Sequence, residues 1–300
     1  MTFGRICAYL WAKFGRYVPD KQYLTIRYWL LYQQYLNLDS PKTFNEKINW
    51  LKIYDRNPLY TRLVDKAEVK NYVSDIIGED HIVPTYGVWE RFEDIDFDKL
   101  PNKFVLKSTN GGGSNGVILC LDKSNFNKNE AKKRLESSMK TKWKTQREWV
   151  YYNVKPRIIA EEFLTADSEN TFIDDYKFFC FNGVPRAILV CKDRFMDTGV
   201  TEDFFTPEWK HLDLQRPGTP NSRSEITPPK ELVEMKEIAE KLSKDIPFVR
   251  VDFYTKSHKV YFGELTFYPA GGLTPFVPSK YDNIFGGWLE IDVMGGVNSL

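Results

Sequence analysis

A hairpin near the end of the chain constrains the fold more than any other stretch. The runs FVRVDFY and KVYFGEL are rich in β-branched and aromatic residues, and a short polar segment separates them, which predicts two antiparallel strands. If residues 256–258 form the loop, Asp252 faces Phe262 across the hairpin. Arg250 then faces Glu264. The chain is therefore expected to contain antiparallel sheet.

This register places the polar side chains of the hairpin together, because side chains alternate between the two faces of a strand. One face carries Arg250, Asp252, Glu264 and Thr266, and the other carries Val251, Phe253, Tyr261 and Leu265. Two carboxylates on one face supply hard oxygen ligands of the kind that Mg²⁺ prefers. A surface hairpin with an ordinary Arg250–Glu264 cross-strand pair is the other interpretation.

A glycine-rich connection separates a second pair of predicted strands. Lys107 ends the run KFVLK, the segment STNGGGSNG follows, and VILCL is the next strand. Glycines without side chains leave backbone N–H groups exposed, and such groups can cover phosphate oxygens. The loop residues in question are Gly111, Gly112, Gly113 and Ser114. A flexible hairpin loop without a ligand is the alternative, and the chain has neither a Walker-type nor a dinucleotide-binding glycine motif.

Taken together, these segments resemble the ATP-grasp superfamily, and in particular its TupA-like branch, which is associated with bacterial surface polysaccharide synthesis. The matching segments are KTFNEKINWLKIYDR, LVDKAEVKNYV, KFVLKSTNGGGSNGVI, RIIAEEFL, DYKFFCFNGVP and RVDFY followed by VYFGELTFYPAGG. The resemblance implies an α+β fold in which two antiparallel-sheet subdomains clamp ATP after a helical N-terminal region. The expected parts are a helical region at 1–60, the first part of the core at 61–100, a glycine-rich lid at 101–165, and a metal-binding and acceptor subdomain at 166–300.

The resemblance also implies roles for individual residues. Lys66 and Lys107 would reach the nucleotide phosphates, and Arg250 would stabilise charge on the transferring phosphoryl group. Asp252 and Glu264 would hold Mg²⁺, or Mn²⁺ in its place. Thr266 stands where the superfamily usually has asparagine, which puts the third protein ligand in doubt.

The hinge that would hold adenine and ribose falls at Glu161, Glu162 and Leu164. Because neighbouring residues of a strand face opposite sides, at most one of the two glutamates is expected to point into the cleft, and we favour Glu162. Lys177 lies in the apolar strand YKFFCF. It is either a lysine at a strand edge or a third cation for the phosphates.

Composition is compatible with an ordinary globular enzyme. The chain has 300 residues, of which 42 are basic and 41 acidic, so no strong positive field points to nucleic acid as a partner. Four cysteines lie far apart without metal-ligand spacing, which favours reduced thiols in the cytosol.

The N-terminal sixty residues are aromatic and basic. No apolar run is long enough to span a bilayer. The segment is expected either to pack on the catalytic core or to rest on the inner face of an anionic membrane as an amphipathic helix. Ser40, followed by Pro41, is the predicted start of one of its helices.

The activity that the resemblance implies is Mg²⁺·ATP-dependent ligation of a carboxylate to an amine through an acyl phosphate. An acidic small molecule or glycan, such as a uronic acid in surface-polysaccharide synthesis, is the expected acceptor. Three alternatives stay open: a sugar or polyol kinase with Asp175 as base, a glycosyltransferase of the same pathway, and a non-catalytic nucleotide-binding protein.

Overall fold

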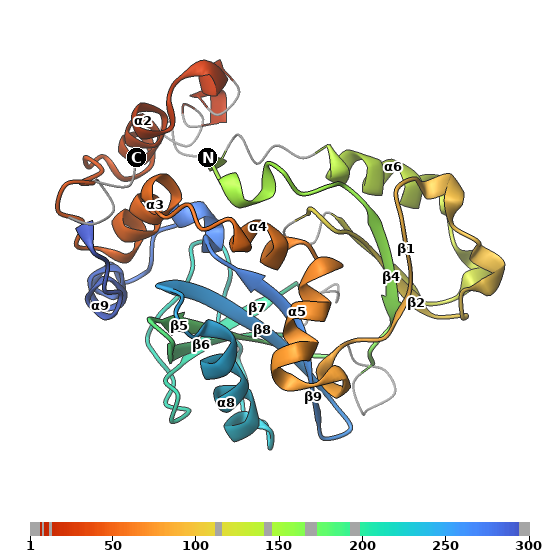
Figure 1. Ribbon diagram of the computed structural model, residues 1–300. Coiled ribbons are helices and arrows are strands. Elements are labelled where there is room, and N and C mark those ends of the chain that lie inside the picture. Colours follow the sequence, from red (N-terminus) through yellow and green to blue (C-terminus); the bar gives the residue numbers. More distant parts are fainter. Residues whose placement is uncertain are drawn as a thin grey trace.

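The computed structural model describes residues 7, 9–11, 14–111, 116–140, 146–165, 173–192 and 199–293. Within these residues the chain forms two antiparallel sheets, with strand orders β1-β4-β2-β3 and β7-β6-β5-β8-β9. The two sheets lie in different parts of the molecule, with the helices α4 and α5 running between them (Figure 1). This is the α+β arrangement of two sheets that the sequence predicted.

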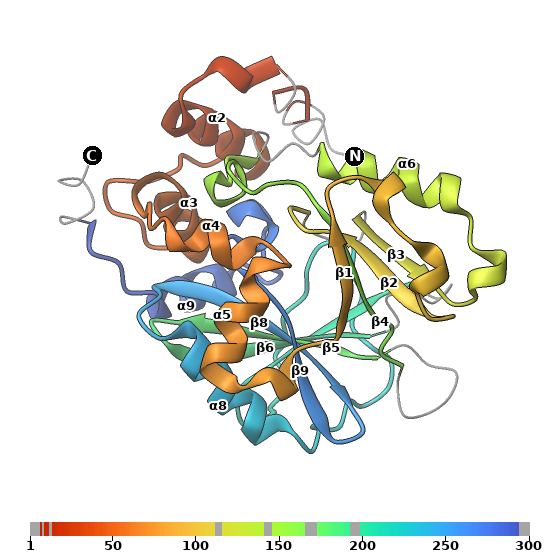
Figure 2. The ribbon, with the colours of Figure 1, turned by 45° about the vertical axis from the view of Figure 1, so that its right-hand side comes forward.

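The smaller sheet is built from two distant parts of the chain. Its strands are β1 (Thr85–Trp89), β2 (Phe104–Ser108), β3 (Val117–Cys120) and β4 (Ile158–Glu162). The helix α6 (Lys128–Met139) covers its outer face in both views (Figures 1 and 2). Phe104, Leu106 and Ala160 are buried against α6 in a core of their own. The opposite face of this sheet is therefore left to line a cavity.

The larger sheet carries the main core. Its strands are β5 (Asp175–Phe181), β6 (Val184–Lys192), β7 (Thr201–Phe205), β8 (Phe248–Lys256) and β9 (Lys259–Thr266). The helix α8 (Leu232–Ser243) packs against it and buries its apolar side chains Met235, Ile238, Ala239 and Leu242 there. The large core includes the aromatic side chains of β5, β8 and α9 (Lys280–Trp288).

The N-terminal helices α2 (Asp20–Tyr32) and α3 (Phe44–Tyr54) join this same core. Tyr23, Leu24 and Tyr28 of α2 are buried in it. The predicted helix start at Ser40 is wrong. The helix begins after Thr43, whose hydroxyl accepts from the backbone N–H of Glu46 while the Glu46 carboxylate accepts from the backbone N–H of Thr43. This reciprocal cap satisfies two backbone donors at once, which a lone serine with proline after it does not.

Two further helices and several short 3-10 turns connect these parts. The helices are α4 (Leu59–Val64) and α5 (Glu68–Ile77), and the turns are η1 (Gly15–Tyr17), η2 (Glu79–His81), η3 (Phe92–Asp94), η4 (Phe97–Lys99), η6 (Lys123–Asn125), η7 (Trp149–Tyr151) and η8 (Pro269–Gly272). Among the described residues, no helix is both long and apolar enough to cross a membrane.

The hairpin of β8 and β9 differs from its predicted register. The turn has two central residues, Ser257 and His258, both with positive φ (51° and 58°), as the tightest hairpin turns require. Asp252 consequently pairs with Glu264 and not with Phe262, because one extra residue, Gly263, bulges out of β9. Arg250 pairs with Thr266 and not with Glu264.

A turn one residue shorter than predicted would by itself place the polar side chains of β8 and β9 on opposite faces of the hairpin. The bulge at Gly263 brings them back to one face. All four predicted polar residues of the hairpin share one face, although Tyr261 lies opposite Tyr254 and so leaves the face of Phe253. A side chain at position 263 would press on the backbone oxygen of Asp252, because a Cβ there would lie 3.0 Å from it. Glycine therefore permits the close approach that the bulge needs.

Candidate active site between the two sheets

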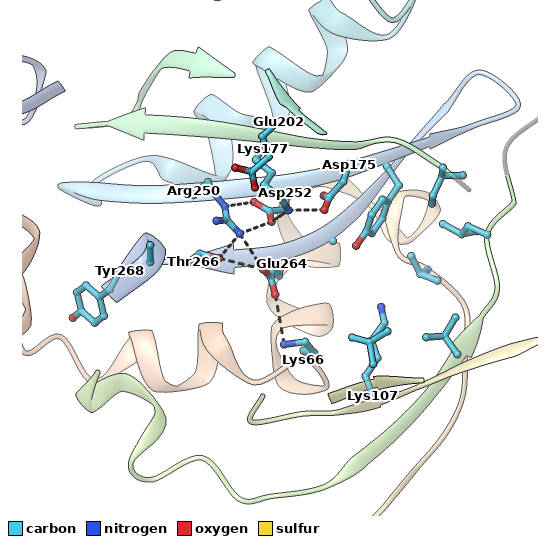
Figure 3. Close-up of a pocket in the computed structure, with 18 of the residues that line it drawn as sticks. Lys66, Lys107, Asp175, Lys177, Glu202, Arg250, Asp252, Glu264, Thr266 and Tyr268 are labelled. Carbon is cyan, nitrogen blue, oxygen red and sulfur yellow. Dashed lines mark hydrogen bonds and ion pairs between the residues drawn. The ribbon is translucent and has the colours of Figure 1, made fainter. Parts of the chain in front are cut away.

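A cavity of about 430 Å³ lies between the two sheets. The smaller sheet contributes Lys107 and the larger one contributes Arg250, Asp252 and Glu264, and Figure 3 shows these side chains around one space. Lys66 enters from the connection between α4 and α5. The structure thus brings together the lysines and the acids that the sequence placed in one site.

Arg250 and Asp252 form a buried, two-pronged ion pair. The Nε and Nη2 atoms of Arg250 donate to the two carboxylate oxygens of Asp252, each at 2.6 Å. Burial alone would lower the pKa of Arg250, but the neighbouring Asp252 and Glu264 carboxylates raise it well above its usual value. Nη2 also donates at 3.1 Å to Glu264 and at 3.1 Å to Thr266. The Arg250 guanidinium therefore contacts each of the other three polar residues of the hairpin (Figure 3).

Lys177 adds a second buried cation to this cluster. It lies on β5 opposite Asp252, and its ammonium is 2.5 Å from Asp252 and 2.6 Å from Asp175. Burial lowers the pKa of Lys177, but Asp175 and Asp252 outweigh that effect and raise it. The sequence allowed Lys177 to lie at a strand edge or to face the site. In the structure its side chain faces the cavity.

Lys66 joins the glycine-rich loop to the hairpin. Its ammonium donates to the backbone oxygen of Gly111 and lies 3.5 Å from the Glu264 carboxylate. The side chain is only 14% exposed, so it is not a solvated lysine of a helix start. Gly111 is the one loop residue of the predicted phosphate cover within the described part of the chain. Gly112, Gly113 and Ser114 lie outside it.

Lys107 is held in place by a buried glutamate. The register of β2 and β4 puts Lys107 and Glu161 on the same face, where the lysine ammonium is 2.5 Å from the carboxylate. Lys70 contacts the other oxygen of Glu161. Burial would raise the pKa of Glu161, but Lys107 and then Lys70 lower it to about 2. Glu161 therefore lies beneath the lysine and aims it, and it is not among the residues that line the cavity.

The hinge side of the cavity is largely apolar. Glu162 and Leu164 line it, as expected, beside Val83, Val105 and Leu119. The Glu162 carboxylate also accepts from Lys256 at 3.1 Å, which joins the end of β4 to the hairpin of the other sheet. Apolar walls with a few polar groups are typical of a small-molecule pocket.

The donor set of the hairpin fits a hard cation when phosphate oxygens complete the shell. Mg²⁺ is usually bound by one or two carboxylates plus substrate phosphates, and Asp252 and Glu264 face each other across β8 and β9. The described residues hold no cluster of three or more acidic, histidine or cysteine side chains suited to a metal. Thr266 donates to Glu264 at 3.3 Å, so its hydroxyl orients that carboxylate.

Several cavity residues were missed from the sequence. They are Gln146, Glu148, Tyr151, Glu202, Arg216 and Tyr268. All but Tyr268 come from segments outside the recognised motifs, and neither periodicity nor spacing singles out any of the six. A single acid or arginine in a loop carries no signal of burial in one sequence.

Comparison with solved structures finds ATP-grasp ligases at low similarity. A D-alanine–D-alanine ligase from Helicobacter pylori is 16% identical with a TM-score of 0.44, and the match covers 82% of this chain and 69% of that one. The corresponding enzyme from Bacillus anthracis is 18% identical, with a TM-score of 0.41 and coverage of 79% and 67%. That from Coxiella burnetii is 14% identical, with a TM-score of 0.42 and coverage of 85% and 61%. No curated protein matches the chain.

The comparison with family models is more decisive, because it matches most of the sequence. The model for TupA-like ATP-grasp proteins matches residues 46–290. This span includes both sheets and every described side chain assigned above to the phosphate and metal side of the cavity. The chain belongs to the TupA-like ATP-grasp family.

Proposed function

We propose that the protein is a Mg²⁺·ATP-dependent carboxylate–amine ligase that acts through an acyl phosphate. The observation that carries the proposal is the convergence of Lys107 from one sheet with Lys66 and the Arg250–Asp252–Glu264 cluster on one cavity. Phosphoryl transfer depends mainly on positioning and on neutralising phosphate charge, and such a set of groups supplies both.

The nucleotide would lie across the cavity from the hinge to the hairpin. Val105, Leu119 and Leu164 provide an apolar slot for adenine, and Glu162 lies at its edge. Lys66 and Lys107 would bind the phosphates, together with the backbone of the loop that begins at Gly111. In the structure these two lysines are paired with Glu264 and Glu161. A polyphosphate would draw the Lys66 ammonium away from Glu264.

Mg²⁺ would be held by Asp252 and Glu264, where it would neutralise charge on the phosphates. The protein's own contribution to the transfer is Arg250, whose guanidinium is rigidly aimed by Asp252. Its Nε and Nη2 atoms are engaged by the hairpin, so a charge-assisted hydrogen bond to a phosphoryl oxygen would come from Nη1. The carboxylate of the first substrate would receive the γ-phosphoryl group and become an acyl phosphate.

The acceptor half of the cavity is suited to an acidic substrate. Lys177 and Arg216 line it, and the Arg216 guanidinium lies 3.9 Å from Glu202. We therefore propose a uronic acid as the carboxylate substrate, joined to an amino acid or amino sugar during surface-polysaccharide synthesis on the cytoplasmic side of the membrane. Attack of the amine on the acyl phosphate releases inorganic phosphate and forms an amide.

The direct test is phosphate release by purified protein with ATP, Mg²⁺ and a panel of uronic acids and amines. Release should depend on both a carboxylate and an amine, and Lys107→Ala and Glu264→Ala should each abolish it. Lys99→Ala is the matched control, because this side chain is 85% exposed and pairs only on the surface with Asp96. Full activity in both site variants would refute the assignment of the cavity.

Product analysis separates this proposal from a kinase. A kinase would leave a phosphorylated sugar and ADP, whereas ligation leaves ADP, free phosphate and an amide. Asp175, the residue considered as a kinase base, is buried and forms an ion pair with Lys177. Its carboxylate is therefore already engaged by a cation of the protein, which favours the ligase.

Peripheral membrane contact remains a separate proposal. The apolar side chains of α2 that enter the core cannot also face lipid, but Phe14, Tyr17 and Trp29 are exposed at 71%, 83% and 42%. Exposed aromatic residues near basic ones suit an anionic surface. Sedimentation with anionic and neutral vesicles tests this idea, and equal recovery in both supernatants would contradict it.

A further inference from the structure

Glu148 is a buried acid that faces the cavity and has no described role in the site above. Its side chain is 6% exposed, and it lines the cavity beside Gln146 and Tyr151. Among the described residues, none donates a hydrogen bond to its carboxylate. A buried carboxylate has about four acceptor positions, and leaving them without donors costs several kcal/mol.

The nearest compensating charge does not supply these donors. Lys52 of α3 is 1% exposed, but its ammonium donates to the backbone oxygens of Gly271 at 2.6 Å and Gln146 at 3.1 Å. It forms no ion pair with Glu148 within 4.0 Å in the described part of the chain. Burial raises the pKa of Glu148 to about 7, and Lys52 opposes that rise. Lys52 therefore balances the charge of Glu148 and leaves its oxygens to the cavity.

The backbone around Glu148 is held rigidly. Arg147 has a φ of 58°, a left-handed conformation that is rare for residues other than glycine. Its guanidinium donates to the backbone oxygens of Gly15 and Val18, at 3.1 and 2.8 Å, and lies over the ring of Tyr23. The N-terminal region thus fixes the segment that presents Glu148, and strained backbone of this kind is concentrated at functional sites.

The space in front of Glu148 is kept open by a glycine. A Cβ at Gly271 would lie 2.2 Å from the Gln146 side-chain oxygen and 3.3 Å from a Glu148 oxygen. The charges of both Glu148 and Glu264 act on the Tyr151 hydroxyl. Glu148 is therefore close to the end of the cavity where Arg250 and Glu264 lie, and away from the apolar hinge.

We propose, resting on the ligase function above, that Glu148 is the binding site and proton acceptor for the incoming amine. A substrate ammonium carries three N–H donors and a positive charge, which are the two things that the Glu148 carboxylate lacks. The carboxylate binds the ammonium and takes one proton from it, which gives a neutral amine beside the reacting centre. Lys52 and Arg147 are positioning residues for this group.

The chemistry balances without a further reactant. The ammonium R–NH₃⁺ and the Glu148 carboxylate give R–NH₂ and the carboxylic acid. The amine nitrogen then forms a bond to the acyl carbon, and the bond from that carbon to the phosphate oxygen breaks. The phosphate takes the second proton from the nitrogen and leaves as HPO₄²⁻, and Glu148 returns its proton to water.

Hydroxylamine as the nucleophile distinguishes the activation of the amine by Glu148 from the formation of the acyl phosphate. It is largely unprotonated at neutral pH, so it attacks an acyl phosphate without needing a site for an ammonium or a base. With ATP, Mg²⁺, the uronic-acid panel and hydroxylamine, Glu148→Gln should form hydroxamate within about twofold of wild type. With an amine as nucleophile, kcat/KM should fall at least tenfold, and the KM for the amine should rise.

Each outcome decides between the proposals. Amide formation by Glu148→Gln within twofold of wild type, with an unchanged KM for the amine, overturns the role of Glu148 and leaves the ligase function standing. If wild type forms no hydroxamate with any carboxylate, the ligase function fails, and this inference with it. Lys107→Ala should form neither amide nor hydroxamate, because Lys107 acts in the formation of the acyl phosphate, before the nucleophile reacts.

A double variant controls for unfolding of the Glu148→Gln protein. Glu148→Gln leaves the Lys52 charge buried without its counterpart, and this alone could unfold the chain. If that variant loses both products, Lys52→Met combined with Glu148→Gln removes both charges. Hydroxamate without amide in this folded double variant supports the proposal, and the loss of hydroxamate from it overturns the proposal.

Discussion

Replacing Glu161 with glutamine should expose how strongly this residue fixes Lys107. The carboxylate is 5% exposed and contacts both Lys107 and Lys70, so its charge is little screened by water. The lysines lower its pKa from 4.5 to about 2 in the folded protein. This difference is worth about 3 kcal/mol of folding free energy at pH 7.

The sign of the pH dependence follows from the direction of that change. Because the folded pKa is depressed, the stabilisation is fully present above the unfolded value of 4.5 and is lost as the pH falls toward 2. At pH 3 about 2 kcal/mol of it should be gone. Glutamine has no charge to lose, so Glu161→Gln should lack this part of the dependence.

Urea unfolding of both proteins at pH 7, 5, 4 and 3 measures the effect. The difference in unfolding free energy between wild type and Glu161→Gln should be largest at pH 7 and shrink by about 2 kcal/mol at pH 3. Taking the difference cancels the other titrating groups that both proteins share. A difference that stays constant over this range would refute the buried three-residue pairing and, with it, the view that Glu161 aims Lys107.

Three further substitutions test other parts of the structure. Gly111→Ala should lower stability by about 1–3 kcal/mol in thermal unfolding and weaken ATP binding, because a Cβ there would lie 2.2 Å from the Ser108 hydroxyl. Gly287→Ala is its control. Nothing lies within 4 Å of a Cβ at that position, so this substitution should be neutral or stabilising. Arg250→Leu should cost about 3–5 kcal/mol by urea unfolding, since it leaves Asp252 buried without its fork, and a loss below 1 kcal/mol would contradict the pairing. Cys180 should resist thiol labelling in the native state, because burial raises its pKa to about 12, whereas fast labelling would show an open core.

The hairpin shows which part of a site one sequence can predict. Period-two alternation correctly placed Arg250, Asp252, Glu264 and Thr266 on one face, since burial of the other face fixes it. The predicted turn, however, was one residue too long. The bulge at Gly263 compensates for this difference, and a lone glycine in a strand only weakly indicates a bulge.

The glutamates of β4 show a second limit. Alternation separated Glu161 from Glu162 and favoured the latter for the cavity, which the structure agrees with. The position of Glu161 beneath two lysines depends on Lys70 of α5, which is 91 residues away in sequence. Ion pairs between residues so far apart in the sequence leave no local sequence pattern, so they are seen only in the folded structure.

Glu148 and Lys52 were beyond prediction for the same reason. Lys52 lies in a helix of the N-terminal region that was expected either to cover the core or to meet a membrane. The structure packs α3 on the core. Two of its polar residues lie against the loop after β9, where Asn49 donates to the Gly272 oxygen at 2.7 Å and Lys52 to the Gly271 oxygen. The described residues of the N-terminal region therefore do not line the cavity, but through Lys52 they contact two residues that do, Gln146 and Gly271.

The most direct test of the account is a crystal structure with Mg²⁺ and the non-hydrolysable ATP analogue AMPPNP. We expect the analogue in the cavity between the two sheets, with its phosphates bonded to Lys66 and Lys107 and the metal on Glu264 and Asp252. An analogue bound elsewhere, or phosphates turned away from both lysines, would contradict the central claim that the two sheets act together on one nucleotide.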